Sequence, residues 1–152
     1  MNNFQRINSI SNAHVGRDFE KIALKHFSQQ NIELVKDVSI LVGVRETKKG
    51  HRFDLGTPDE AMEKVIVECK SHRWTTGGNT PSAKMTVWNE AMYYFYLAPN
   101  EYRKVFFILK DVNIKRNETL GEYYIRIYQH LIPENVEILE YDEENGVVRR
   151  LI

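Results

Sequence analysis

The sequence predicts an α/β protein with a mixed central sheet flanked by helices. Segments whose apolar residues recur every three or four positions, as on one helix face, alternate with short runs of β-branched and aromatic residues typical of strands. The predicted order is helix, three strands, helix, strand, helix, strand. Strands joined by a turn pair antiparallel, whereas strands joined through a helix pair parallel, so one sheet containing all of them is mixed.

The chain has 152 residues, of which 42% are hydrophobic and 28% charged, as expected for one folded domain with a core. No repeat, low-complexity segment or linker divides it, so residues 1–152 are expected to form a single domain. The formal net charge is zero, so overall charge neither favours nor excludes a nucleic-acid partner.

Cysteine usage and hydropathy indicate the compartment. The single cysteine, Cys69, excludes an internal disulfide and suits a reducing cytoplasm. No apolar stretch approaches the roughly 18 residues of a membrane span, and no signal-peptide core follows the N-terminus. A cytoplasmic protein with no membrane contact is therefore expected.

The first helix is predicted to follow Ser11 or Asn12, either of which can cap it. Its apolar positions, spaced by three and four residues over about four turns, are Val15, Phe19, Ile22, Ala23, Leu24 and Phe27. Glu20 lies beside this stripe rather than opposite it. Its carboxylate is therefore either at the edge of the buried face or an exposed helix charge.

Three strands are predicted next. Residues 32–42 form the first, with a bulge around residues 36–37, and a polar, basic loop follows over residues 43–50. The second strand ends at Asp54, and turn-forming residues 56–60 lead to a third strand over residues 64–70. Consecutive strands without a helix between them predict an antiparallel meander.

The second half adds helix–strand pairs. A helix is predicted over residues 82–97, and its apolar stripe with neighbouring tyrosines is broad enough to cover the sheet and also a second subunit. Residues 105–109 are all apolar, as in a strand covered on both faces, and the helix before them makes a right-handed crossover. A third helix over residues 120–132, a strand over residues 136–141 and a short tail over residues 147–152 complete the chain.

Three charged residues converge in this arrangement. Side chains alternate along a strand, so Glu68 and Lys70 share one face and Cys69 points to the other. A hairpin between the second and third strands brings Asp54 alongside them. Two adjacent carboxylates repel each other unless a cation lies between them, and magnesium suits such oxygen ligands. A lysine beside the ion can hold a water molecule or a phosphate oxygen, which predicts metal-assisted hydrolysis of a phosphodiester.

Asp54 followed by Glu68-Cys69-Lys70 resembles the motif of the PD-(D/E)XK nuclease superfamily. The match departs from the motif at Phe53, where the motif's name has proline, a position that varies across the superfamily. The resemblance covers nearly the whole chain in element order, and the motif itself covers residues 52–70. It implies a restriction-endonuclease-like αβββαβ core with an extra C-terminal αβ pair.

The resemblance also implies roles for individual residues. Asp54, Glu68 and the backbone carbonyl of Cys69 would hold one or two Mg²⁺ ions, with Mn²⁺ as a substitute. Lys70 would orient the attacking water, and Glu20 on the first helix would point toward the metal. DNA is the expected substrate, cut to leave a 5′-phosphate and a 3′-hydroxyl. A chain with one site would cut both strands as a homodimer or in two binding events.

Two cations near the proposed site are expected to contact the substrate. Arg73 leaves the third strand within a segment where basic and aromatic residues interleave. Lys84 lies in the first turn of the second helix, where free backbone amides also favour phosphate, although simple solvent exposure explains it equally well. His72 is a weak candidate and is left out of the catalytic set.

Alternative functions remain open. Glu68 and Lys70 can be a solvated strand end and Asp54 a turn residue, in which case the chain is a catalytically silent module that binds DNA or protein on the same fold. A small-molecule hydrolase is the other alternative, but the sequence has no Gly-x-Ser-x-Gly motif and no cysteine–histidine arrangement to support it. The pathway, whether restriction, repair, phage defence or mobile-element processing, is not encoded in these residues.

Overall fold

A computed structural model describes the backbone of residues 3–152 and the side chains of residues 16–152. The elements in order are α1 (Asn3–Ser28), β1 (Val35–Val42), β2 (Lys49–Gly56), β3 (Val65–Lys70), α2 (Ser82–Leu97), β4 (Arg103–Leu109), β5 (Val112–Asn113), β6 (Glu118–Thr119), α3 (Leu120–Tyr128), a 3₁₀ turn (Gln129–Leu131), β7 (Val136–Asp142) and β8 (Val147–Arg150). The predicted α/β class and the mixed sheet flanked by helices are confirmed.

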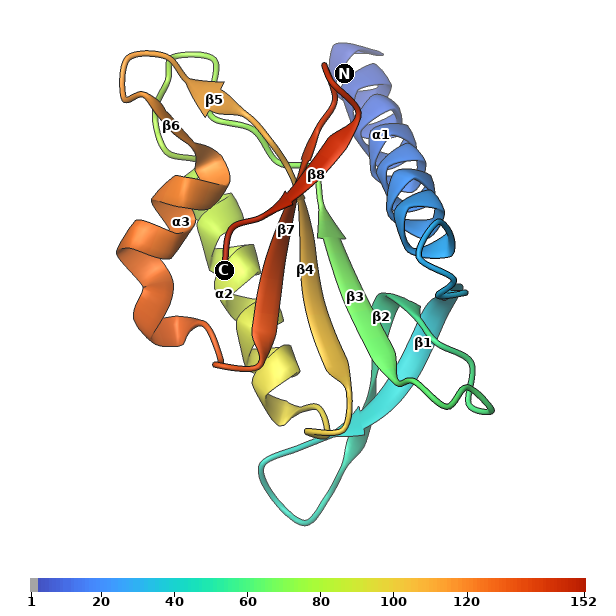
Figure 1. Cartoon of the computed structure of the whole chain (residues 1–152). Coiled ribbons are helices and arrows are strands. Elements are labelled where there is room, and N and C mark those ends of the chain that lie inside the picture. The colour runs from blue at the N-terminus through green and yellow to red at the C-terminus, as the bar shows by residue number, and fades with distance from the viewer. Residues whose placement is uncertain (1–2) are drawn as a thin grey trace.

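The main sheet has six strands in the order β1-β2-β3-β4-β7-β8. The first three strands form the predicted antiparallel meander, whereas β3–β4 and β4–β7 are parallel pairs. Helices α2 and α3 make the two parallel connections, and both cover the same face of the sheet (Figure 1). The two connections run from β3 to β4 and from β4 to β7, each to the next strand in the same direction, and right-handed crossovers of this kind place their helices on the same face of the sheet. Helix α1 covers the other face.

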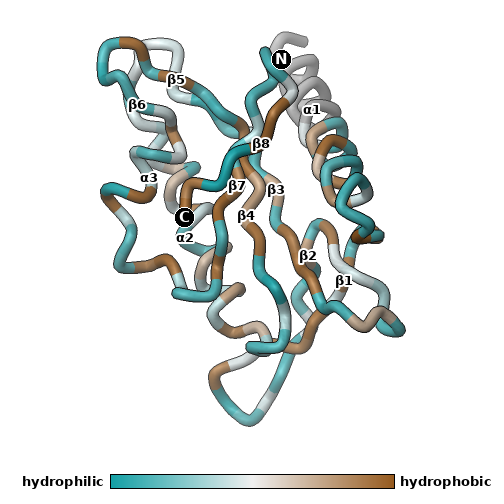
Figure 2. Tube along the Cα trace, in the orientation of Figure 1, coloured by the Kyte–Doolittle hydropathy of each residue, from teal (hydrophilic) through white to brown (hydrophobic). Residues whose placement is uncertain are grey.

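Each face of the sheet carries its own apolar layer. Under α1, Phe19, Ala23 and Phe27 pack on a set of strand residues, namely Leu55, Val65, Val67, Val105 and Phe107. Under α2 and α3, Trp88, Phe95 and Tyr124 pack on the opposite faces of the same strands. Strand β4 is therefore covered on both sides, as its continuous apolar sequence predicts, and the apolar colouring concentrates along the central strands (Figure 2).

Several details of these elements differ from the sequence prediction. Helix α1 begins at Asn3 and runs through the predicted cap at Ser11 or Asn12. Strand β1 begins at Val35 rather than at residue 32, and its pairing with β2 keeps one register past the left-handed residue Asp37 (φ 58°), so the predicted bulge adds no residue. Helix α3 ends at Tyr128, where a 3₁₀ turn replaces its last predicted turn.

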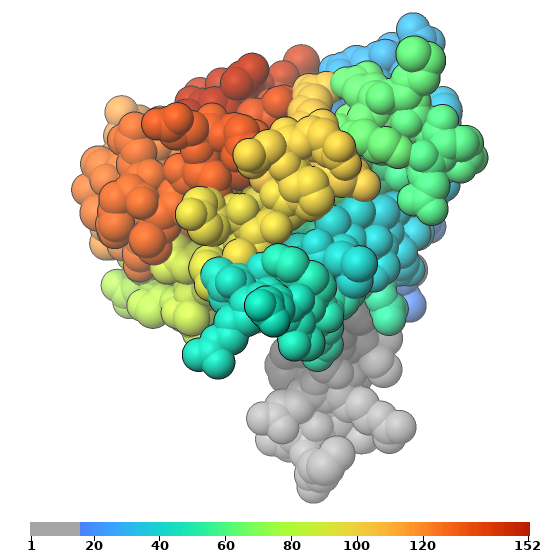
Figure 3. Space-filling view, turned by 90° about the horizontal axis from the view of Figure 1, so that it is seen from below, coloured from blue at the N-terminus to red at the C-terminus, as the bar shows by residue number. Residues whose placement is uncertain are grey.

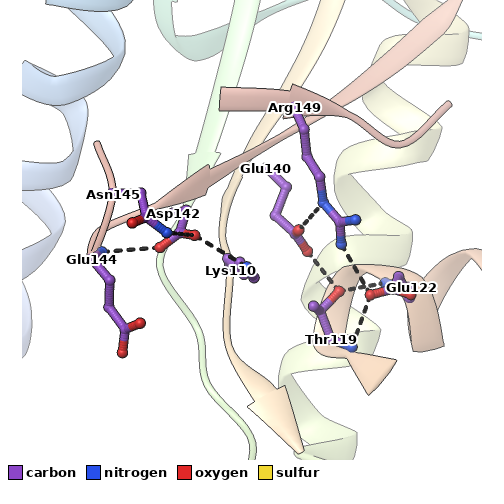
Figure 4. Close-up of polar contacts among 8 residues, drawn as sticks. All are labelled: Lys110, Thr119, Glu122, Glu140, Asp142, Glu144, Asn145 and Arg149. Atoms are coloured by element: carbon purple, nitrogen blue, oxygen red, sulfur yellow. Dashed lines mark hydrogen bonds and ion pairs between the residues drawn. The ribbon is translucent and has the colours of Figure 1, made fainter. Parts of the chain in front are cut away.

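The C-terminal segment is a sheet strand rather than a tail. Strand β8 pairs antiparallel with β7, and an ionic cluster attaches it to α3 (Figure 4). In that cluster, fully buried Glu140 accepts hydrogen bonds from Arg149 Nε (2.8 Å) and Thr119 Oγ1 (2.6 Å). Arg149 also reaches Glu122 at 3.0 Å. Because a buried carboxylate must be paired, these contacts fix the place of β8.

The strands β2 and β3 separate at the end of the sheet that the predicted site occupies. Their paired residues are only Leu55 with Val67 and Gly56 with Ile66, so Asp54 and Glu68 lie where the two strands begin to diverge. The opposite end of the molecule is formed by the β1–β2 turn, residues 57–64 and the beginning of β4 (Figure 3). Within the described part of the chain, no helix has both the length and the apolarity needed to cross a bilayer.

Candidate active site

The divergence of β2 and β3 fixes the position of the Asp54 side chain. The backbone N–H of Cys69 donates to Asp54 Oδ2 at 2.8 Å, in the region where strand pairing has stopped. A carboxylate oxygen thus replaces the strand carbonyl that a continued ladder would offer to this N–H. Asp54 is held by backbone, and its carboxylate lies directly beside β3.

Glu68 lies next to Asp54 in a less polar position. It is only 6% exposed, and its two oxygens are each 3.6 Å from a basic group, Lys70 Nζ and His51 Nε2. Burial, together with the adjacent charge of Asp54, raises the pKa of Glu68 to about 8, although the Lys70 ammonium opposes the shift. Glu68 is therefore the carboxyl of the pair that holds a proton most readily.

The side chains of β3 alternate between the two faces of the sheet, as predicted. Lys70 lies on the face of Glu68, whereas the Cys69 side chain packs against the apolar layer under α1. Burial raises the pKa of the Cys69 thiol, so this side chain is an apolar packing group rather than a nucleophile. Only the backbone groups of Cys69 are available to the site.

A cleft of about 600 Å³ opens over these residues. Its walls come from α1, the fork between β2 and β3, the segment that leaves β3 and the first turn of α2, and they are lined by Gly16, Phe19, Glu20, Asp54, Cys69, Lys70, Ser71, His72, Arg73 and Lys84. Glu68 is buried and is not among the residues that line this cleft. Asp54, Lys70, Glu20, Arg73 and Lys84, all predicted from the sequence, thus share one cleft.

Glu20 interacts electrostatically with Asp54 and Lys70. Partial burial raises its pKa, and the negative charges of Asp54 and Asp37 add to that effect, whereas Lys36 and Lys70 oppose it. Asp37 lies on β1 across from Asp54, at its left-handed turn, and the sequence prediction did not include it. Its alignment with Asp54 follows from strand register, which local patterns do not determine.

The two predicted substrate cations have different surroundings. Arg73 forms ion pairs with Glu143 (2.7 Å) and Asp111 (3.4 Å), so most of its charge is already balanced. It joins the segment after β3 to the end of β4 and to the β7–β8 turn. Lys84, by contrast, has no carboxylate partner among the described residues, and its charge is available to a ligand in the cleft.

His72 is a cleft residue that the sequence prediction left out of the catalytic set. The indole Nε1–H of buried Trp88 donates to His72 Nδ1 at 2.7 Å. Indole N–H groups only donate, so His72 Nδ1 carries no proton and the ring hydrogen is on Nε2. Burial lowers the pKa of His72 to about 4, and the charges of Lys84 and Lys70 act in the same direction. His72 is thus a neutral N–H donor in the wall of the cleft.

The oxygen donors fit a magnesium ion better than a transition metal. Among residues 16–152, no three side chains of His, Cys, Asp or Glu are grouped as a cage for a metal ion. Two adjacent carboxylates and a backbone carbonyl are instead the partial ligand set that Mg²⁺ accepts, because this ion keeps several waters. Burial and the adjacent charge of Asp54 raise the pKa of Glu68, and a cation bound between the two carboxylates would oppose that effect.

Neither a family model nor a curated protein matches this chain.

Proposed function

We propose that this protein is a Mg²⁺-dependent deoxyribonuclease with a restriction-endonuclease-like αβββαβ core, extended by the α3–β7 pair and β8. The observation that supports the proposal best is the meeting of Asp54, Glu68 and Lys70 at the fork between β2 and β3. The order of α1, β1 to β3, α2 and β4 agrees with that core. The lone Cys69 agrees with a cytoplasmic location.

In this proposal, the charged residues of the site have distinct roles. Asp54, Glu68 and the carbonyl of Cys69 would hold Mg²⁺, which polarises the scissile phosphate and lowers the pKa of a bound water when present. Lys70 supplies positive charge next to the two carboxylates, which orients the attacking water and offsets charge that develops on the phosphate. Glu20 accepts hydrogen bonds from water in the same cleft.

The wall of the cleft that is formed by the segment after β3 and the first turn of α2 would hold the DNA backbone. The ammonium of Lys84 and the Nε2–H of His72 are donors there that have no acidic partner among residues 16–152. They suit the oxygens of a phosphate next to the scissile bond. Arg73 would shape the wall through its ion pairs with Glu143 and Asp111, so its proposed substrate contact is secondary. Hydrolysis would leave a 5′-phosphate and a 3′-hydroxyl, and a homodimer would cut both strands.

The test is cleavage of supercoiled plasmid in Mg²⁺ or Mn²⁺ by wild type and Lys70→Ala. Wild type is expected to nick and linearise the plasmid, and Lys70→Ala to lose at least about 100-fold in rate, because a charge that acts in the transition state is removed. Lys64→Ala, at the other end of β3, is a matched control that should cut at the wild-type rate. Equal cutting by wild type and Lys70→Ala would contradict the proposal.

A catalytically silent DNA- or protein-binding module is the second candidate. The burial of Glu68 and the hydrogen bond that already occupies Asp54 Oδ2 favour it, because both reduce the oxygens open to a metal. Calorimetric titration with Mg²⁺ separates the two functions. A nuclease binds the ion and Asp54→Asn binds it less tightly, whereas a silent module shows no metal-dependent heat in either protein.

A further inference from the structure

The β5–β6 hairpin stands beside the cleft and outside the main sheet. It pairs Val112 with Thr119 and Asn113 with Glu118, and its tip contains exposed Lys115 and Arg116. A left-handed residue, Asn117 (φ 52°), turns the chain back at the tip. In Figure 1 the hairpin projects from the end of the molecule at which β3 ends.

The hairpin is held against the segment that forms the cleft wall. Asn113 is only 7% exposed, and its side-chain amide donates to the carbonyl of Gly78 at 2.9 Å, while its side-chain oxygen accepts from the backbone N–H of Arg116 at 3.2 Å. At the base of the hairpin, Leu120 N–H donates to the carbonyl of Asp111 at 3.0 Å. These bonds give the hairpin a fixed place relative to the segment after β3.

The tip carries positive charge that no carboxylate balances within residues 16–152. Lys115 has no ion-pair partner there, and the guanidinium of Arg116 lies over the rings of Trp74 (5.3 Å) and Tyr123 (5.8 Å) instead of beside an acid. The acidic groups closest in sequence are already used, since Asp111 pairs with Arg73 and Glu118 with Arg126. The charges of Lys115 and Arg116 are thus available to an anionic partner.

The surface between the tip and the cleft is continuous. A hollow of about 530 Å³ is lined on one side by residues 73–78 and on the other by residues 111–115, and Arg73 lines both this hollow and the cleft. A ligand that reaches the cleft along this wall therefore meets the hairpin next.

We infer that the β5–β6 hairpin is a second DNA contact, which binds backbone phosphates of the duplex that flanks the scissile bond. This inference rests on the proposed nuclease function and extends it. A two-stranded ribbon with cations at its tip has the width to follow a duplex groove, and cations that lack acidic partners release counterions from DNA when they bind. The hairpin contributes affinity, whereas Lys70 contributes to the reaction.

The experiment compares the double variant Lys115→Ala/Arg116→Ala with wild type in binding to a fluorescent 20-base-pair duplex. Ca²⁺ replaces Mg²⁺ to avoid cleavage, and the salt concentration is varied. The variant is expected to bind about 10-fold more weakly near 0.1 M salt, with a log–log salt slope less negative by about 1–2, because two phosphate contacts are lost. At saturating DNA its cleavage rate in Mg²⁺ should equal that of wild type.

The matched control is Lys48→Ala/Lys49→Ala, which removes the same charge from the β1–β2 turn at the opposite end (Figure 3). It should bind like wild type. Lys115→Ala alone removes no ion pair or hydrogen bond among residues 16–152 and should weaken binding in the same direction. Arg116→Lys, which keeps the charge, should restore most of the affinity that Arg116→Ala loses.

Three results would overturn the inference: wild-type affinity in the double variant, an equal loss in the control pair, or a loss confined to single-stranded DNA. Each of these leaves the nuclease proposal standing. If wild type itself binds no duplex, the proposed function fails, and this assignment of the hairpin fails with it.

Discussion

At the scale of single residues, the two carboxylates at the fork are kept chemically different. Asp54 accepts a hydrogen bond from the backbone of Cys69, whereas the oxygens of Glu68 lie 3.6 Å from Lys70 Nζ and from His51 Nε2 and beside the Asp54 carboxyl. Burial and the adjacent charge of Asp54 raise the pKa of Glu68, so Glu68 is the carboxyl of the pair that holds a proton more readily.

This difference predicts how stability depends on pH. The folded protein raises the pKa of Glu68 from 4.5 to about 8, so the Glu68 contribution is most favourable below pH 4.5 and is lost as pH rises to about 8. Without divalent ions, Glu68→Gln should resemble wild type at pH 5 and exceed its free energy of unfolding at pH 8 by a few kcal/mol, on the order that such a shift implies. Urea unfolding at both pH values measures this.

The control for this measurement is Glu134→Gln, which changes an exposed glutamate and should leave the difference between pH 5 and pH 8 as in wild type. A Glu68→Gln curve parallel to that of wild type across this range would show that Glu68 is already ionised in the folded protein.

Sequence alone predicted part of the site. Alternation along β3 placed Lys70 beside Glu68, because that relation is local. The hydrogen bond from Trp88 to His72 joins residues that are distant in the chain, so no local pattern indicated that His72 is a neutral donor. The ion pair between Arg73 and Glu143 is equally non-local, and for this reason Arg73 looked like a free substrate cation in the sequence.

At the scale of elements, one residue, Thr119, both caps helix α3 and hydrogen-bonds a buried side chain of strand β7. Thr119 Oγ1 accepts the N–H of Glu122, and Glu122 Oε1 accepts the N–H of Thr119, which makes a reciprocal cap. The same hydroxyl donates to buried Glu140 on β7 (Figure 4). The cap therefore orients the helix and satisfies a buried charge.

Thr119→Ala should lower the free energy of unfolding by about 1–3 kcal/mol, because both the cap and a hydrogen bond to a buried carboxylate are removed. Thr119→Ser keeps the hydroxyl and should lose about 1 kcal/mol or less, the contribution of one buried methyl group. Chemical denaturation of the two variants measures whether Thr119→Ala loses more stability than Thr119→Ser. Equal losses would mean that the methyl, rather than the hydroxyl, supports α3.

Element prediction succeeded where a pattern is long. Helix α2 has the predicted bounds, and strand β4 contains the predicted residues 105–109 and begins two residues before them. Strands β5 and β6 span only two residues each, too short for a periodic pattern, and their pairing depends on contacts with the segment around Gly78. Strand β8 has four residues and is mostly exposed, so only its pairing with β7 identifies it.

At the scale of the whole molecule, β4 joins the two apolar layers. Phe106 contacts the layer under α2 and α3, its neighbour Phe107 contacts the layer under α1, and both side chains are fully buried. If the chain is one cooperative domain, damage to either layer should destabilise both.

Phe106→Ala and Phe107→Ala are each expected to lose about 3–5 kcal/mol of stability and to unfold in a single transition. The measurement is denaturant unfolding followed by tryptophan fluorescence, which reports Trp74 and Trp88 in the layer under α2 and α3, and by far-ultraviolet circular dichroism, which reports the whole chain. Transitions that do not coincide in the Phe107→Ala protein would show that the layer under α1 unfolds separately.

The Cys69 N–H that holds Asp54 belongs to the main chain, and no side-chain replacement at another position removes it. The spacing between the aspartate and the glutamate is thus a property of the path of two strands. Residues around the fork can change widely in type without moving these oxygens, provided that the strands keep diverging after Leu55 and Val67. Insertions or deletions that shift this divergence would move the carboxylates apart, even if every residue of the motif were retained.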